Sequence, residues 1–116
     1  MKLALTRLFG LAPPAKKLMN YDDAKRQAGD PDERKRAKLA RRGDVQPEVL
    51  YFLAADEAPQ VRRAIAGNQA TPVHADLVLA RDADDDVRCA VAEKVARLAP
   101  GLSSEQRARV GDIVVE

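Results

Sequence analysis

An internal repeat with a period of 26 residues is the feature that most constrains the fold of this chain. Each unit contains an aspartate, an arginine six residues later and an alanine four residues after the arginine. The aspartates are Asp30, Asp56 and Asp82, the arginines are Arg36, Arg62 and Arg88, and the alanines are Ala40, Ala66 and Ala92. A fixed period of this length is typical of solenoids, in which each unit buries its apolar face only against its neighbours.

Each unit carries the signals of two short antiparallel helices. Pro47 and Pro72 stand near the first positions of helices, where a missing N–H costs nothing. Thr71 is the expected N-cap of the helix that Pro72 opens. In the second helix of a unit, Val61 and Ile65 have the i, i+4 spacing of one buried face.

These signals predict an all-α fold, a short right-handed α-solenoid of about three helix pairs plus a final unpaired helix. The predicted pairs cover residues 20–42, 47–67 and 72–98, and the unpaired helix covers 103–115. The solenoid domain spans 20–116 and follows an N-terminal segment, 1–19. The side chains expected to form the buried face of the Pro-led helices are Val49, Leu50, Phe52, Leu53, Leu77, Val78 and Leu79.

Residues 1–19 combine an amphipathic stretch with a linker that contains Pro13 and Pro14. Arg7 divides the apolar stretch into pieces shorter than the roughly 7–15 residues of a secretory signal's apolar region. A peripheral membrane contact through residues 1–15 is one alternative function. Such a contact would be weak, because a single small apolar face anchors poorly.

The composition agrees with closely packed helices. Aromatic residues make up 3% of the chain and tryptophan is absent, so the core must be built from Ala, Leu and Val. Cys89 is the only cysteine, which excludes an internal disulfide and a cysteine-rich zinc site and favours a cytoplasmic location. We expect its thiol to be partly buried. The formal net charge of +2 does not by itself indicate a nucleic-acid partner.

A group of basic side chains distinguishes the first unit from the others. These residues, which fall within a sector of roughly 120° on a helix, are Arg34, Lys35, Lys38, Arg41 and Arg42. Lys35 and Lys38 align with Val and Ala positions of the later units that look buried, so this face must be open or paired. Two interpretations of this face are open: a solvated N-terminal cap, and a docking patch for an acidic protein or peptide. The same face can serve as both.

The acidic residues of the third unit raise the question of a metal site. At positions 1, 3, 5 and 12 of a calcium-loop pattern stand Asp82, Asp84, Asp86 and Glu93. Position 6 is Val87, where the loop requires glycine, so the acids are better explained as the start of a helix. His74, the only histidine, is expected to face solvent. The sequence therefore predicts no enzyme, no metal or cofactor, and no catalytic residues.

The second helices resemble those of HEAT-like repeats, through the pattern D-x-x-x-x-V-R. In that group a turn aspartate and a helix arginine form a ladder that links neighbouring repeats. The resemblance implies three rungs, namely Asp56 with Arg62, Asp82 with Arg88, and Asp30 with Arg36 as the poorest. The period is shorter than the roughly 40 residues of HEAT units and closer to that of leucine-rich-repeat-variant proteins. The lone Cys89 excludes the iron–sulfur cluster that some of those carry.

Most of the chain is similar to the N-terminal half of a bacterial helical-repeat family known only as a domain of unknown function. The stretches that carry this likeness are "YDDAKRQAGDPD", "LARRGDVQPEVLYFLAADEAPQVRRAIAGNQATP" and "EKVARLAPGLSSEQRARV". The resemblance implies the fold and supplies no activity. Members of that family continue beyond the position of Glu116, so the resemblance also implies a longer solenoid.

Together these patterns predict a non-enzymatic protein–protein interaction or scaffold module with an acidic protein or peptide as its partner. One alternative is a nucleic-acid-binding HEAT-like module, which is disfavoured because no aromatic residue is interleaved with the basic ones. The others are a peripheral membrane adaptor through residues 1–15 and a structural piece that self-associates through residues 103–115.

Overall fold

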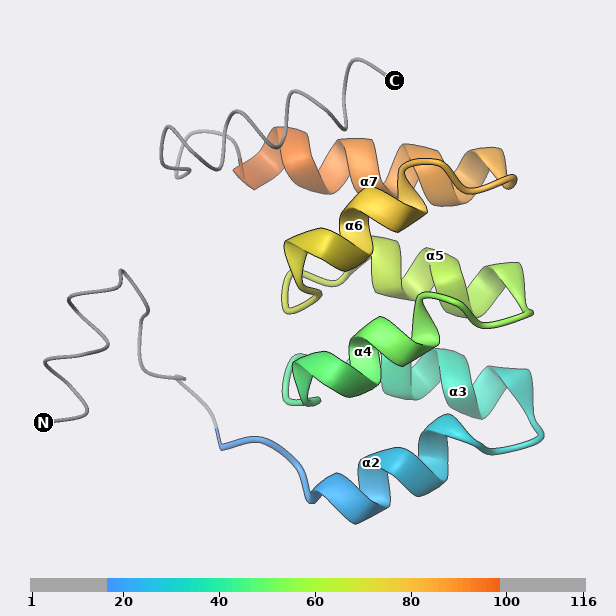
Figure 1. Ribbon diagram of the computed structural model, residues 1–116, viewed down its shortest axis with the longest axis vertical. Coiled ribbons are helices and arrows are strands. Elements are labelled where there is room, and N and C mark those ends of the chain that lie inside the picture. The colour runs from blue at the N-terminus through green and yellow to red at the C-terminus, as the bar shows by residue number, and fades with distance from the viewer. Residues whose placement is uncertain (1–16, 99–116) are drawn as a thin grey trace, which may run out of the picture.

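The computed structural model describes residues 17–98, which contain six helices and no strand (Figure 1). These are α2 (Tyr21–Ala28), α3 (Glu33–Ala40), α4 (Pro47–Leu53), α5 (Pro59–Gly67), α6 (Val73–Leu79) and α7 (Asp85–Leu98). The predicted all-α class is confirmed, and the helices fall within the three predicted ranges. The expectations for the segment 1–15 and for the helix 103–115 lie outside the described residues.

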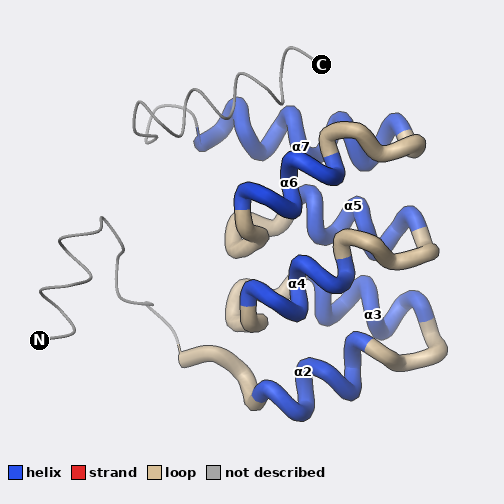
Figure 2. Tube along the Cα trace, viewed as in Figure 1, coloured by secondary structure: helices blue, strands red, loops and turns tan. Residues whose placement is uncertain are grey.

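The six helices are arranged in two layers joined by short loops (Figure 2). Helices α2, α4 and α6 form one layer, and α3, α5 and α7 lie one above another in the second (Figure 1). Within the second layer, α5 contacts both α3 and α7. Helix α3 therefore ends the stack of the described residues on one side and α7 ends it on the other.

Local sequence explains where the helices begin. The side-chain oxygens of Asn20 and Asp32 accept hydrogen bonds from the backbone N–H groups of Asp23 and Arg34, which caps α2 and α3. Proline stands in the first turn of α4 and of α5, where its missing N–H is not needed.

The expected cap at Thr71 is wrong. Helix α6 begins at Val73 with Pro72 as its N-cap, and the buried Thr71 hydroxyl instead donates to the carbonyl of Ile65, at 2.8 Å. Thr71 thereby satisfies a carbonyl near the end of α5, one of the acceptors that a helix terminus leaves open.

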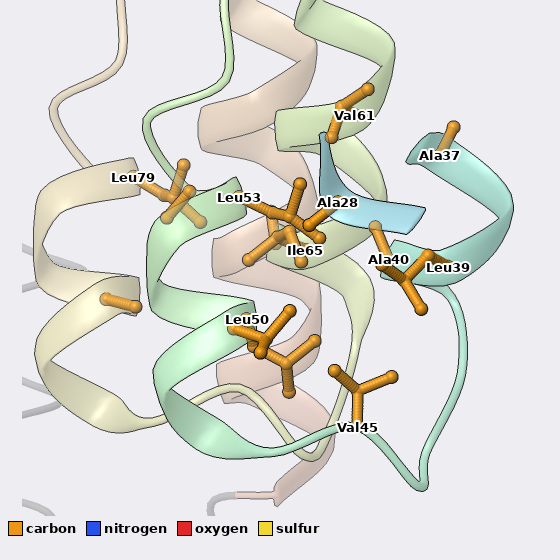
Figure 3. Close-up of a cluster of buried hydrophobic side chains, with 14 of the residues drawn as sticks. Ala28, Ala37, Leu39, Ala40, Val45, Leu50, Leu53, Val61, Ile65 and Leu79 are labelled. Carbon is orange, nitrogen blue, oxygen red and sulfur yellow. The ribbon is translucent and has the colours of Figure 1, made fainter. Parts of the chain in front are cut away.

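The core consists of small aliphatic side chains drawn from both layers. Ala28 of α2, Leu53 of α4 and Ile65 of α5 lie together in it (Figure 3). Two residues expected in the core are exposed, since Phe52 and Val78 keep 62% and 54% of their surface. Each lies on the side of its helix that turns away from the second layer, because the residue two positions earlier is buried and two positions correspond to about 200°.

No helix of the described residues is long and apolar enough to cross a membrane.

Candidate functional site

The predicted basic residues of the first unit all lie exposed on α3 and the loop that follows it. We call Arg34, Lys35, Lys38, Arg41 and Arg42 the α3 basic face. The residues that align with Lys35, namely Val61 on α5 and Val87 on α7, are completely buried. A preceding helix of the stack is packed against α5 and α7, whereas α3 is the first helix of its layer among residues 17–98, so its lysines reach water.

Two of the five basic side chains have nearby carboxylates. Arg42 donates from Nε and Nη2 to the two oxygens of Asp44 at 2.8 and 2.7 Å, and this hydrogen bonding raises the pKa of Arg42. Arg34 Nε lies 3.4 Å from Asp32. Within residues 17–98, the other three members of the face, Lys35, Lys38 and Arg41, form no ion pair. These three charges are available to a ligand.

The repeat arginines on α3 and α5 link successive units. Arg36 donates from Nε and Nη2 to the carboxylate of Asp56, at 2.8 and 3.1 Å, and from Nη1 to the carbonyl of Asp30, at 2.7 Å. Arg62 repeats this pattern one period later, with Asp82 at 2.7 and 3.2 Å and the carbonyl of Asp56 at 2.7 Å. Each planar guanidinium thus joins the backbone of its own unit to a carboxylate of the next.

The ladder therefore differs from the expected one, which paired each aspartate with the arginine of its own unit. Arg36 and Arg62 reach only the main-chain carbonyl of their own aspartates. The cause is the orientation of the aspartate side chain, which is turned back on its own loop: Asp56 Oδ1 accepts a hydrogen bond from the N–H of Ala58, at 2.9 Å. This local bond directs the carboxylate toward the preceding unit.

Both ends of the ladder differ from its middle. Arg88, on α7, donates to the carbonyl of Asp82 and to the carboxylate of Asp85 in its own unit. At the other end, Asp30 accepts the N–H of Asp32 at 2.8 Å, as Asp56 does that of Ala58, but no arginine side chain of the described residues reaches its carboxylate. Two carboxylate rungs therefore hold three units together.

The ladder carboxylates have pKa values below the usual 3.8. Burial alone would raise the pKa of Asp56 and of Asp82, but the hydrogen bonds from the arginines and from the backbone N–H groups outweigh it. A carboxylate with a lowered pKa stabilises the folded state above its unfolded pKa, and this contribution is lost as the pH falls through the folded pKa.

We therefore expect the urea midpoint of unfolding to fall between about pH 5 and pH 3, and to fall less steeply when Asp56 and Asp82 are both changed to Asn. The double variant should also be less stable than the natural chain at pH 7. Urea titrations at a series of pH values measure both effects. Asp76, whose pKa is raised by burial, contributes the opposite slope in both proteins and cancels from the comparison. Parallel pH profiles would contradict the expectation.

A buried ion pair between Lys94 and Asp76 was not predicted. Lys94 on α7 is 1% exposed, and its Nζ donates to Asp76 Oδ1 at 2.6 Å and to the carbonyl of Asn68 at 3.0 Å. The Asn68 side chain in turn donates to the carbonyls of Ala40 and Arg42, at 2.8 and 2.7 Å. A chain of polar contacts thus connects α7 through the α5–α6 loop to the end of α3.

The repeat alignment contained a signal for this pair. Asp76 stands one period after Leu50, which is completely buried, and Lys94 stands one period after Asn68. Two opposite charges at interior positions of the same unit are expected to pair, because an unpaired buried charge is strongly unfavourable.

The remaining candidates for chemistry lie apart from one another. His74 is exposed, as predicted, and its ring centroid lies 4.8 Å from that of Tyr51.

Cys89 is also exposed, so the expectation of a partly buried thiol is wrong. The described residues place no helix over that side of α7. Asp84 accepts the N–H groups of Asp86 and Val87 at the start of α7, at 2.9 and 3.1 Å. Residues 17–98 contain no group of three metal-ligating side chains.

In comparisons with known proteins, no family model, no curated protein and no solved structure matches this chain. The chemistry of a partner is therefore inferred from the exposed groups of the described residues. Of these, the α3 basic face places three cations without an ion pair on one helix end, and ammonium and guanidinium groups bind carboxylates and phosphates.

Proposed function

We propose that this chain is a non-enzymatic interaction or scaffold module that binds an acidic protein or peptide through the α3 basic face. In this proposal its helix pairs form a short right-handed α-solenoid of the HEAT-like kind, as in the bacterial family that the sequence resembles. The two layers of helices and the 26-residue period support the architecture. The single cysteine supports a cytoplasmic location.

One observation carries the functional proposal. Lys35, Lys38 and Arg41 occupy an end of the stack without an ion pair in residues 17–98. The helix that bears them is held by Arg36, which is directed toward the next unit. A fixed group of like charges orients an acidic partner and raises its association rate more than it raises affinity.

An acidic protein is favoured over nucleic acid by the composition of this surface. Clustered basic side chains hold phosphates as readily as carboxylates. Single-stranded nucleic acid additionally requires aromatic side chains for stacking, and the α3 basic face contains none.

The proposal predicts that changing Lys35, Lys38 and Arg41 to Gln removes an acidic partner. In affinity capture from nuclease-treated lysate, read by quantitative mass spectrometry, we expect its recovery to fall about tenfold or more. The matched control changes Lys17, Arg26 and Arg97, which are exposed and lie outside the face, to Gln and removes the same charge. Circular dichroism and thermal melting establish that both variants are folded.

A partner lost from the first variant and kept by the control supports the proposal. Equal recovery by all three proteins would reduce the face to a solvated cap. A partner captured from untreated lysate and absent from nuclease-treated lysate, together with binding to DNA or RNA that falls steeply as salt rises, would favour the nucleic-acid alternative.

A further inference from the structure

A groove runs between the parallel helices α2 and α4, on the layer opposite the α3 basic face. It consists of two open hollows of about 870 and 300 Å³ that share Ala28, Glu48 and Phe52. We call it the α2–α4 groove. The lining residues that matter for its chemistry are Tyr21, Asp30, Glu48, Tyr51, Phe52 and Glu57.

The groove contains every tyrosine and phenylalanine of residues 17–98. Tyr21, Tyr51 and Phe52 are exposed there, although the core of the same residues contains no aromatic side chain. A core of small aliphatic residues leaves no space for these rings, and their exposure keeps apolar surface in water. A contiguous exposed apolar surface beside polar residues marks an interaction site.

The rim of the groove is acidic along the larger hollow, whereas the smaller hollow also contains Lys25, whose Nζ lies 5.4 Å from the centroid of the Tyr21 ring. Glu48, Glu57 and Asp30 line it and form no ion pair with the described residues, whereas Asp56 is neutralised by Arg36. An aromatic floor with a carboxylate rim fits a short segment that combines apolar side chains with Lys or Arg.

We propose that the occupant of the α2–α4 groove is the N-terminal segment of the same chain, residues 1–12. The segment contains Leu5, Leu8 and Phe9 together with Lys2 and Arg7, and residues 1–17 include no Asp or Glu. Its apolar groups match the aromatic floor and its basic groups match the carboxylate rim. The proposal is independent of the α3 basic face.

The point at which the described part of the chain begins favours this occupant. Met19 is held beside the start of α4, because its N–H donates to the carbonyl of Asp44 at 2.8 Å and its carbonyl accepts from Gln46 Nε2 at 2.6 Å. Tyr21, two residues later, already lines the groove. The segment is therefore tethered at the end of the groove that contains Tyr21 and Glu48.

The segment is long enough for Phe9 to reach any point along the α2–α4 groove. The eight residue-to-residue steps from Phe9 to Lys17 span up to roughly 27 Å when extended, whereas α2, with eight residues, is about 12 Å long. A tethered segment has an effective concentration of about millimolar, so even weak complementarity keeps it bound.

The absence of tryptophan from the chain allows a direct test on the full-length protein. A Phe9→Trp substitution places a single indole in the segment, and acrylamide quenching of its fluorescence measures its exposure. We expect quenching about threefold weaker than in a free peptide of residues 1–16 with the same substitution, because a bound segment is shielded. Adding Phe52→Asp should restore quenching to the level of the peptide.

The matched control is Val78→Asp. Val78 stands one period after Phe52, is also exposed and lies outside the groove, so this change should leave the protection intact. Phe52 is 62% exposed, so its replacement leaves the core in place, and circular dichroism verifies this. Changing Glu48 and Glu57 to Lys should weaken the protection without removing the aromatic floor.

Several results would overturn the proposal. Quenching equal to that of the free peptide in the unmodified groove would show that the segment is not bound. Protection that disappears on dilution would identify a second copy as the occupant. Protection that appears only with phosphatidylglycerol-containing vesicles would identify a membrane contact. Equal effects of Phe52→Asp and Val78→Asp would exclude the groove as the binding surface.

Discussion

Changing Asp76 to leucine is expected to destabilise the fold by about 3 kcal/mol or more, because it leaves a buried positive charge without its carboxylate. The ammonium group of Lys94, which is 1% exposed, then keeps the carbonyl of Asn68 as its remaining partner. Burial already lowers the pKa of Lys94 and raises that of Asp76, while their mutual hydrogen bond opposes both shifts. Without the carboxylate, desolvation of the ammonium is no longer offset.

The paired substitution separates a buried charge from a generally damaging mutation. Leu50 occupies the position equivalent to Asp76 one period earlier and is completely buried, so leucine suits this environment. Combining Asp76→Leu with Lys94→Met should therefore recover most of the lost stability, because neither charge then remains. Urea unfolding of both single variants and of the double variant gives the coupling energy. A double variant that loses the sum of the two single losses would contradict the interpretation.

Changing Arg62 to methionine is expected to cost about 2 kcal/mol, because it removes a rung of the ladder. The change leaves the carboxylate of Asp82 without its guanidinium and the carbonyls of Asp56 and Glu57 without a donor. The loss should appear as a lower urea midpoint with an unchanged slope, because the same surface is exposed on unfolding.

The equivalent arginine at the end of the stack provides the control. Arg88 bonds only within its own unit in the described residues, so Arg88→Met should cost less than half as much as Arg62→Met. Arg62→Lys should recover little, because one ammonium group cannot bind a carboxylate through two parallel N–H bonds and a backbone carbonyl at once. Equal losses at Arg62 and Arg88 would show that the link between units contributes nothing.

The helices were predictable because their signals are local. Proline in the first turns and the spacing of Val61 and Ile65 act within a few residues, and they place the helices in the observed order. The prediction of buried side chains from apolar spacing was wrong for Phe52 and Val78, which are exposed. A count of apolar residues along a seven-residue helix does not reveal which side meets the second layer.

Some of the candidate sites were predictable from the sequence and one was not. The α3 basic face was predictable because a repeat exposes any residue that departs from its equivalents, as Lys35 departs from Val61 and Val87. The Asp76–Lys94 pair was recoverable by the same comparison. The α2–α4 groove was not, since its walls come from two helices whose contact no single unit specifies.

By itself, the sequence determined the all-α class, the number and order of the helices within residues 17–98, and the position of the basic face, because periodicity and capping are properties of neighbouring residues. The tertiary structure alone decided that Arg36 binds the carboxylate of Asp56 and not that of Asp30. It also decided that the aromatic side chains line a groove and that Lys94 is buried. Each of these depends on how one unit is placed against the next, and that placement follows from the packing of many weak contacts across both layers.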